Sequence, residues 1–354
     1  MKDRKTTIFL GAYLNFTNAQ NLNCRALALN LDKSKFKIYS LYLFSGNLPS
    51  VEGVTYFNCF RPLKVSSYLA YAWGIFKSDV VYLPKTDCIK WNRFLLKIFK
   101  KKSFSTIEGV LSGTNLEKAL TAFGSKNELV KSYAAFDKTY SITNFLGVHN
   151  LESLNLKTEK EILHLGVDSD QFSAVVSSKL SDVLLIGNQL QHKGLEDYII
   201  LAARFPDLIF HIVGSTSDQY VQDLLSIDKH KNIICHEKLS HQQLNQLFQS
   251  VQLHILPSRS EGFPKVILET ASAGIPSLVY SDYGASEWIT NNKNGFVVNS
   301  CSDMIEVVEN ILRLPESFSK VSESAIALGR SFDWKIIVKR WETEISALSS
   351  NNFD

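Results

Sequence analysis

The chain has 354 residues, of which 45% are hydrophobic and 21% charged, and its formal net charge at pH 7 is +3. This length suits two domains better than one, and the composition excludes a disordered or collagen-like chain. No run reaches the ~18 consecutive apolar residues that a membrane-spanning helix needs. The apolar run after the charged N-terminus is short, so we expect a first strand there rather than a signal peptide.

Short apolar runs alternate with amphipathic stretches along the whole chain, which predicts repeated βα units and parallel sheets. In the first half the expected strands are Thr7–Tyr13, Lys37–Phe44, Val54–Phe60, Asp79–Leu83, Phe104–Glu108 and Thr139–Phe145. In the second half they are Val183–Ile186, Leu208–Val213, Asn232–His236, Leu253–Leu256, Ser277–Tyr280 and Gly295–Val298. Leu195–Arg204 and Ser302–Leu312 have apolar residues at helical spacing. Two such sets of strands fit two doubly wound domains better than one very wide sheet.

A polar stretch at residues 151–161 separates the two sets of strands, and we place the domain boundary there. The first predicted domain covers residues 1–155 and the second covers residues 156–332. The terminal helix, residues 333–349, carries Trp334 and Trp341 and is expected to pack back on the first domain. Because ligands of such sheets bind beyond the carboxyl ends of the strands, we expect the domains to face each other across a cleft.

The charge is distributed unevenly between the two halves of the chain. Residues 1–160 contain 23 Lys and Arg against 11 Asp and Glu, whereas residues 161–354 contain 15 against 24. This predicts an anionic partner for the first half, either nucleic acid or a membrane surface. No nucleic-acid-binding motif accompanies the charge, so we expect the membrane surface and no nucleic acid. Five dispersed cysteines without a CxxC pair predict reduced thiols and a cytoplasmic protein. Because the first half is basic, we expect this protein to be peripheral on the inner face of the cell membrane.

Residues 90–102, KWNRFLLKIFKKK, predict a basic amphipathic helix. Trp91, Phe94, Leu95, Ile98 and Phe99 follow helical spacing on one face, and Lys and Arg occupy the remainder. This composition is typical of a helix that lies on anionic lipid. The alternative is an ordinary helix whose apolar face packs on its sheet and whose lysines are solvated. We favour contact between Lys90–Lys102 and an anionic membrane surface because the whole domain is basic.

The segment after the strand Leu253–Leu256 holds the most chemistry. Pro264 begins a helix that ends near Ala273, with Gly274 as its stop and Pro276 beyond. The backbone N–H groups from Gly262 to Val266 then form an anion site at a helix N-terminus, where a diphosphate fits without a metal ion.

Two carboxylates belong to this segment. Glu261 lies at the mouth of the anion site, and Glu269 lies further along the helix, where it can accept two hydrogen bonds from a sugar or ribose diol. The alternative is that Glu261 caps the helix and Glu269 belongs to its solvated face.

Glu261–Glu269 and its flanks resemble the E-x7-E region of family-4 retaining glycosyltransferases, which have the two-domain GT-B architecture. Four more segments match that family in order: Leu163–Phe172 (with His164 where asparagine is usual), Ile186–Gly194, Phe210–Ser215 and Gly284–Val298. The resemblance covers about residues 139–345 well and the first 138 loosely. It implies an α/β GT-B fold, with an acceptor-binding first domain and a second domain that binds a nucleotide-sugar donor.

The resemblance also implies roles for single residues. Glu261 would contact the hydroxyls of the transferred sugar, Glu269 would bind the donor ribose, and Lys193 would neutralise the leaving diphosphate. The backbone of Gly262, Phe263 and Pro264, with the helix start at Lys265 and Val266, would hold sugar and phosphate. For Lys193 the alternative is an exposed lysine at a helix start.

Two other positions depart from the family pattern, and a third, Gly11, matches it. Asn188 stands where the family usually has arginine. Asparagine can hydrogen-bond a phosphate but supplies no charge, so stabilisation of the leaving group depends more heavily on Lys193. Gly11, after the first strand, matches a glycine-containing turn near the donor phosphates. Glu108 ends a strand where related enzymes often have histidine, and it either acts on the acceptor or sugar, or caps the next turn.

We expect neither a metal ion nor a cofactor. Asp168 and Asp170 spell the D-x-D pattern that binds Mn²⁺ or Mg²⁺ in the other large glycosyltransferase architecture, but here they fall in the segment between the domains. No His/Cys cluster has zinc spacing.

The sequence therefore predicts a metal-independent retaining glycosyltransferase that moves a hexose or N-acetylhexosamine from a nucleotide-diphosphate sugar to a lipid-linked or surface-polysaccharide acceptor. Two alternatives stay open. One is a sugar-nucleotide epimerase or hydrolase of the same fold, and the other is a non-catalytic partner subunit that binds glycan or lipid.

Overall fold

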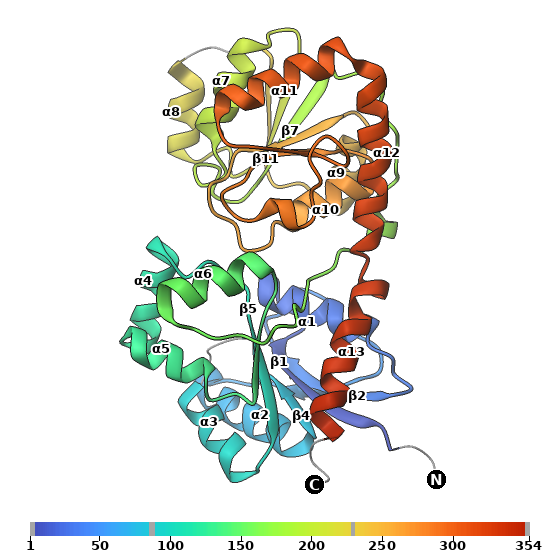
Figure 1. Ribbon diagram of the computed structural model, residues 1–354. Helices are drawn as coiled ribbons and strands as arrows, with labels where there is room; N and C mark the ends of the chain where they lie inside the picture. Colours follow the sequence, from blue (N-terminus) through green and yellow to red (C-terminus); the bar gives the residue numbers. More distant parts are fainter. Residues whose placement is uncertain (1–3, 85–88, 228–230, 351–354) are drawn as a thin grey trace. The chain divides into compact units, whose positions relative to one another are not determined.

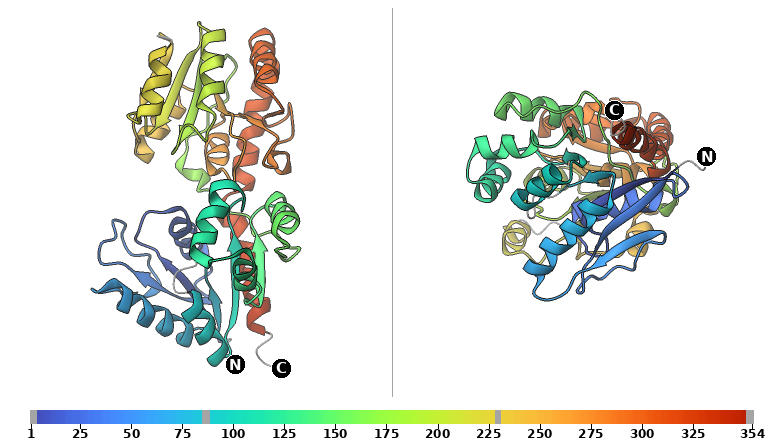
Figure 2. Two further views of the ribbon diagram at one scale, coloured as in Figure 1. Left: turned by 90° about the vertical axis from the view of Figure 1, so that its left-hand side faces the viewer. Right: turned by 90° about the horizontal axis from the view of Figure 1, so that it is seen from below.

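The computed structural model describes residues 4–84, 89–227 and 231–350 and divides into two compact units. Unit 1 contains the residues up to Leu165 together with those from Trp334 onward, and unit 2 contains Gly166–Asp333. Each unit has a six-stranded parallel sheet with helices on both faces (Figures 1 and 2). The expected α/β fold with two doubly wound sheets is confirmed.

The sheet of unit 1 has the strand order β3-β2-β1-β4-β5-β6. Its strands are β1 (Thr6–Tyr13), β2 (Phe36–Tyr42), β3 (Val54–Asn58), β4 (Val80–Tyr82), β5 (Lys102–Ile107) and β6 (Lys138–Ser141). Its helices are α1 (Ala19–Asn30), α2 (Leu63–Lys77), α3 (Ile89–Ile98), α4 (Gly113–Phe123), α5 (Lys126–Tyr133), α6 (Asn144–Leu154) and α13 (Trp334–Ser350).

The sheet of unit 2 has the order β12-β11-β10-β7-β8-β9, which is the same doubly wound arrangement. Its strands are β7 (Asp182–Gly187), β8 (Ile209–Gly214), β9 (Ile233–His236), β10 (Leu253–Leu256), β11 (Ser277–Tyr280) and β12 (Phe296–Val298). Its helices are α7 (Leu195–Arg204), α8 (Gln219–Ile227), α9 (His241–Phe248), α10 (Lys265–Ser272), α11 (Cys301–Arg313) and α12 (Pro315–Ser331), with 3-10 turns η1 (Ser169–Gln171) and η2 (Ala285–Glu287).

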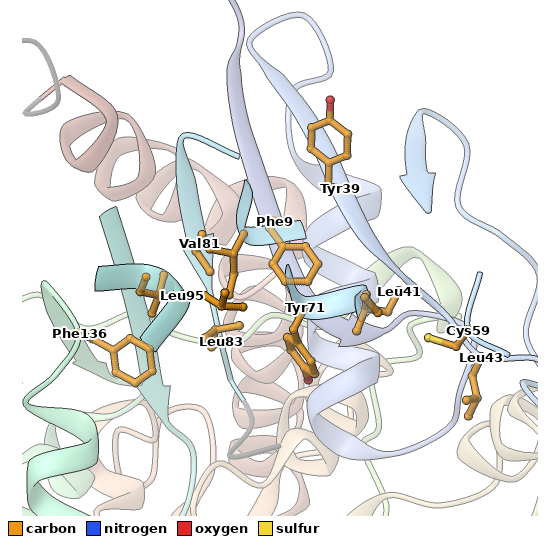
Figure 3. Close-up of a cluster of buried hydrophobic side chains, with 13 residues drawn as sticks. Phe9, Tyr39, Leu41, Leu43, Cys59, Tyr71, Val81, Leu83, Leu95 and Phe136 are labelled. Atoms are coloured by element: carbon orange, nitrogen blue, oxygen red, sulfur yellow. The ribbon is translucent and has the colours of Figure 1, made fainter. Parts of the chain in front are cut away.

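One hydrophobic core of unit 1 lies between the sheet and helices α2 and α3. Strand residues such as Phe9 and Val81 meet Tyr71 of α2 and Leu95 of α3, and all four side chains are buried (Figure 3). Burial of this apolar area stabilises the unit by roughly 25 cal/mol per Å². Strand side chains alternate between the two faces of a sheet, so Tyr82, which follows Val81 on β4, points to the opposite face. There its ring meets Trp341 of α13, with ring centroids 5.4 Å apart.

Helix α13 is fixed to unit 1 by polar contacts as well as by this aromatic packing. The Trp341 indole donates to the His164 carbonyl at 2.9 Å. The Glu344 carboxylate accepts from the Tyr140 hydroxyl at 2.6 Å and pairs with Lys138 at 3.0 Å. The C-terminal helix is therefore an integral part of unit 1.

Four details of the sequence prediction differ from the structure. The units divide after Leu165 rather than after residue 155. Phe145 lies in the first turn of α6, and β6 ends at Ser141. The basic helix ends at Ile98, and Lys102 already belongs to β5. Gly11 lies inside β1, not in a turn after it, where a Cβ would come within 2.4 Å of the Leu83 side chain. Glycine is therefore required at position 11 for core packing.

Cys24, Cys59, Cys235 and Cys301 form no disulfide bonds. Among the described helices, none is both long and apolar enough to cross a bilayer.

Candidate functional site

The predicted site residues of the second half gather at one point of the unit 2 sheet. Strand β7 pairs with β8 on one side and with β10 on the other, so the strand order reverses at β7. Ligands of doubly wound sheets bind beyond the carboxyl ends of the strands at such a reversal. Residues 188–194 follow β7 there, and residues 257–264 follow β10.

Glycines allow the backbone to come unusually close at these strand ends. A Cβ on Gly214 would lie 2.2 Å from the Gly187 carbonyl oxygen, and a Cβ on Gly194 would lie 2.2 Å from the Pro257 carbonyl oxygen. Gly194 also has a φ of +80°, which other residues rarely adopt. The loops after β7 and β10 are thereby held against each other.

Lys193 and Glu261 meet between these two loops. The Lys193 Nζ lies 2.6 Å from the Glu261 Oε1, and the side chains are 21% and 11% exposed. The lysine stem lies against Gly187, where an added Cβ would be 2.9 Å from Lys193 Cε. The Ser258 hydroxyl, which donates to the His192 carbonyl at 3.0 Å, ties the two loops together beside the pair.

Helix α10 begins next to Glu261 and ends as the sequence predicts. Pro264 is its N-cap residue, and Gly274 follows its end with a φ of +86°. The first N–H groups of a helix have no acceptor within the helix, and its dipole places partial positive charge there. Since proline has no N–H, Pro264 shapes this helix start but cannot donate, so the donors of the predicted anion site are the other backbone N–H groups between Gly262 and Val266.

Glu269 lies on α10, partly exposed. Burial raises the pKa of its carboxyl above the usual value, while the positive charges of Lys265 and His241 act in the opposite direction. A carboxylate that has lost part of its hydration gains more from hydrogen-bonding hydroxyl groups than a fully solvated one does. This environment differs from the fully solvated helix face that was the alternative.

Two buried polar side chains near this pair were missed from the sequence. His254 is fully buried on β10; its Nδ1 lies 2.9 Å from the Ser277 hydroxyl, and its Nε2 has no hydrogen-bond partner among the described residues. Burial, aided by the Lys193 charge, lowers the pKa of His254 to about 3. Burial and the Glu261 charge raise the pKa of Tyr283, whose hydroxyl also lacks a partner within the described part of the chain.

Only one of these residues left a signal in the sequence. His254 is a polar residue inside the apolar run Leu253–Leu256, which marks an unusual core position. Tyr283 follows β11 without any distinguishing pattern. Phe263, by contrast, was predicted to bind the donor through its backbone. Its ring packs against Trp288 at a centroid distance of 5.5 Å.

Of the remaining predicted site residues, one lies near Lys193 and two lie in unit 1. Asn188 is exposed directly after β7, on the same loop as Lys193. Gly11 and Glu108 belong to unit 1. Glu108 follows β5, and its carboxylate accepts from Asn23 Nδ2 at 2.9 Å and from Thr106 Oγ1 at 3.1 Å. These contacts fix the carboxylate, and its charge adds to burial in raising the pKa of Tyr133 to about 12.

Asp168 and Asp170 lie at the 3-10 turn η1, where Asp168 accepts a hydrogen bond from Gln171 at 2.8 Å. Within the described residues, His, Cys, Asp and Glu side chains form no group of three or more that could hold a metal ion.

Comparison with known proteins agrees with this arrangement. Residues 168–327 match the family model of glycosyl transferases group 1. Unit 2 carries a group 1 glycosyltransferase domain. The matched stretch contains Lys193, Glu261 and Glu269, together with the strand reversal at β7.

Individual relatives of this glycosyltransferase domain extend the comparison to both units. An uncharacterized glycosyltransferase of Haemophilus influenzae is 20% identical over 72% of this chain and 68% of its own length. Alpha-galactosylglucosyldiacylglycerol synthase of Streptococcus pneumoniae is 27% identical over 66% of this chain and 61% of its own length. The chain thus spans about two thirds of these relatives. They support a glycosyltransferase function.

The fold agrees with that of solved GT-B proteins. The Anabaena protein HepE in complex with UDP and glucose superposes with a TM-score of 0.74, at 14% identity, over 97% of this chain and 100% of HepE. The two-sheet α/β fold described above is the GT-B fold.

Proposed function

We propose that this chain is a retaining glycosyltransferase of the family-4 type, which transfers a hexose or N-acetylhexosamine from a nucleotide-diphosphate sugar. The observation that carries the proposal is the contact of 2.6 Å between Lys193 and Glu261 at the strand reversal of unit 2, next to the start of α10. This places one cation, one carboxylate and a helix N-terminus within reach of one small ligand.

Lys193 and α10 provide electrostatic stabilisation of the leaving group. An ammonium group has three N–H donors, and Lys193 uses one of them on Glu261. The remaining donors can bind a diphosphate without breaking the ion pair, while the N–H groups at the start of α10 bind further phosphate oxygens. Negative charge that develops on the departing diphosphate is then neutralised by groups already in position, and a single such donor is worth roughly 10²–10³ in kcat.

The two glutamates hold the sugar parts of the donor. Glu261, fixed by Lys193, accepts hydrogen bonds from hydroxyls of the transferred sugar, and Glu269 accepts them from the ribose. Because Glu261, the carboxylate proposed to contact the sugar, is already paired with Lys193, we propose same-face displacement assisted by the leaving phosphate, which retains the anomeric configuration. No metal ion is needed in this scheme, and the donor is the co-substrate.

The acceptor is proposed to be a lipid-linked or growing surface polysaccharide on the cytoplasmic side of the membrane. The name of the pneumococcal relative, a diacylglycerol glycoside synthase, supports a lipid-linked acceptor, as does the excess of Lys and Arg in residues 1–160. Glu108, held by Asn23 and Thr106, is the proposed acceptor-side carboxylate of unit 1.

The proposal is tested first with near-isosteric substitutions. Lys193→Gln and Glu261→Gln should each lower transfer from the preferred nucleotide sugar by about 10²–10³-fold, because each removes a charge at the reacting centre. Lys238→Gln, a change at an exposed lysine of the same unit, is the matched control and should leave turnover unaltered. Near wild-type turnover in both site variants would show that the site has been assigned wrongly.

Donor and mechanism need separate measurements. A thermal-shift screen across nucleotide sugars identifies the donor, since a ligand that binds the folded state raises Tm. NMR of the product should show the anomeric configuration of the donor, and inversion would contradict the mechanism. Sugar release or epimerisation without any acceptor would instead indicate a hydrolase or epimerase, and binding without any product would indicate a silent partner subunit.

A further inference from the structure

Helix α2 exposes apolar side chains along its length. Val65, Tyr68, Leu69 and Phe76 are 51%, 38%, 51% and 57% exposed, and their spacing places them on one side of the helix. In contrast, Ser66 and Ser67 of the same helix are buried. A helix on the surface of a globular protein usually has the opposite pattern, with polar residues outward.

Helix α3 adds apolar and cationic side chains to the same surface. The side that α3 buries contains Asn92, Leu95 and Leu96. This side is rotated about the helix axis from the apolar face predicted from the sequence, so that Phe94 and Ile98 are each 54% exposed. The exposed Lys90 and Lys97 lie on the same side of the helix as Phe94 and Ile98. Leu95 is buried and Trp91 and Phe99 pack against the core, as expected for the ordinary helix that was the alternative, but that alternative does not account for the exposed Phe94 and Ile98.

The two helices form one continuous surface. The Trp91 indole of α3 donates to the Tyr68 carbonyl of α2 at 3.1 Å, and their rings lie 5.8 Å apart. Further along, the rings of Phe76 and Phe99 lie 5.4 Å apart. Both helices lie on the same face of the unit 1 sheet (Figure 1). We call the exposed side chains of these two helices the α2–α3 surface.

The charge of this surface has one sign. Residues 53–78 and 89–107 contain no Asp or Glu. On the side of α3 away from α2, an open groove of about 700 Å³ is lined by Lys90, Arg93, Lys97 and Lys101. Two acids also line the groove, but each has a lysine partner: Glu128 pairs with Lys131 and Asp137 with Lys102, both at 3.2 Å.

This combination identifies the kind of partner. The buried centre of a protein–protein interface is depleted of lysine, whereas a helix face that mixes exposed Phe, Leu and Val with Lys and Arg is typical of the boundary between lipid headgroups and acyl chains. Cations near that boundary are attracted to anionic headgroups. A bilayer without net negative charge would not attract the cations of the groove in this way.

We propose that the α2–α3 surface binds an anionic lipid bilayer. The apolar side chains of α2 enter the boundary between headgroups and acyl chains, and the cations of α3 and of the groove contact lipid phosphates. α3 thus contributes mainly charge, and α2 most of the apolar area. Because α2 starts where β3 ends, the surface begins at the carboxyl edge of the unit 1 sheet, the edge at which a membrane-held acceptor would have to arrive. All residues involved lie in unit 1, so the inference does not depend on the donor site.

Sedimentation with vesicles of phosphatidylglycerol and of phosphatidylcholine tests the charge. The full chain should bind the first and not the second, and binding should weaken as NaCl is raised. Lys90→Gln/Lys97→Gln/Lys101→Gln should lower the partition coefficient by about 100-fold, as expected for three cations near an anionic surface. A control that removes the same charge from other exposed lysines of unit 1, Lys118→Gln/Lys126→Gln/Lys160→Gln, should lower it far less.

A second pair of variants tests the apolar stripe. Val65→Ser/Leu69→Ser should lower partitioning by about tenfold or more even at high salt, whereas Ile200→Ser/Leu312→Ser, at exposed apolar positions of unit 2, should not. A cooperative thermal transition close to that of the unsubstituted chain shows that each variant is folded, independently of vesicle binding and of the donor site. Equal binding by a test variant and its control would overturn the proposal. So would a dimer in size-exclusion chromatography that Val65→Ser/Leu69→Ser dissociates, because a second copy would then cover the surface.

Discussion

Replacing Gly187 with alanine moves Lys193 while leaving every charged group in place. The added Cβ would lie 2.9 Å from Lys193 Cε and 3.0 Å from Lys193 Cγ, closer than carbon atoms pack. Ordinary contact needs about 3.5–4.0 Å, so the lysine stem has to shift by roughly 1 Å. A shift of that size takes Nζ beyond hydrogen-bonding distance of Glu261 Oε1, now 2.6 Å away.

The expected result is a large loss of activity with little loss of stability. A misplacement of about 1 Å at a reacting centre can cost roughly 10²-fold in rate. Gly187 has no positive φ, and the obstructing atoms belong to a flexible side chain, so we expect the free energy of unfolding to change by no more than about 1 kcal/mol. Steady-state transfer kinetics and thermal unfolding measure the two effects on the same preparation.

Two further variants make the result interpretable. Gly109→Ala is the matched control, since a Cβ there meets nothing within 4 Å and should change neither quantity. In a Gly187→Ala/Lys193→Gln double variant the losses should not add, because both act on the same group. Wild-type kcat/KM in Gly187→Ala, or full additivity in the double variant, would refute the reasoning that Lys193 must occupy this position.

Further variants and conditions probe the rest of the site. Glu269→Gln should raise the KM for the donor roughly tenfold with a smaller change in kcat, as initial-rate kinetics would show, since its proposed role is to bind ribose; an effect confined to kcat would contradict this. Because the folded-state pKa of His254 is about 3, its stabilising contribution is fully present above the unfolded pKa of about 6.5 and is lost as pH falls, by about 2 kcal/mol at pH 5. His254→Asn should lessen the difference in Tm between pH 7.5 and pH 5. An unchanged difference would argue against His254 as the cause of the stability lost at low pH. Gly194→Ala should lower stability by about 2 kcal/mol or more in a denaturant titration, because its Cβ would meet the Pro257 carbonyl oxygen at 2.2 Å, and a wild-type midpoint would contradict the close approach of the loops. EDTA should leave transfer unchanged, and loss of activity that Mn²⁺ restores would direct attention back to Asp168 and Asp170.

The sequence alone was sufficient to predict the strands and the ends of α10. Leu253–Leu256 and Ser277–Tyr280 have the predicted bounds, because strands buried on both faces are mostly apolar along their length. Pro264 and Gly274 mark the limits of α10 through local sterics, which act wherever the helix lies. The same local patterns placed Lys193 after β7 and Glu261 after β10.

Properties that depend on packing between distant segments were decided by the tertiary structure. The pairing of Lys193 with Glu261 at 2.6 Å requires β10 to lie beside β7, and strand order leaves no local mark in the sequence. Gly11 proved to be a core position because the Leu83 side chain packs against it, and Phe94 and Ile98 proved to be exposed because Asn92, Leu95 and Leu96 face the interior. Hydrophobic spacing fixes which side chains share a helix face, but how far that face is turned toward the core depends on the partner that packs against it.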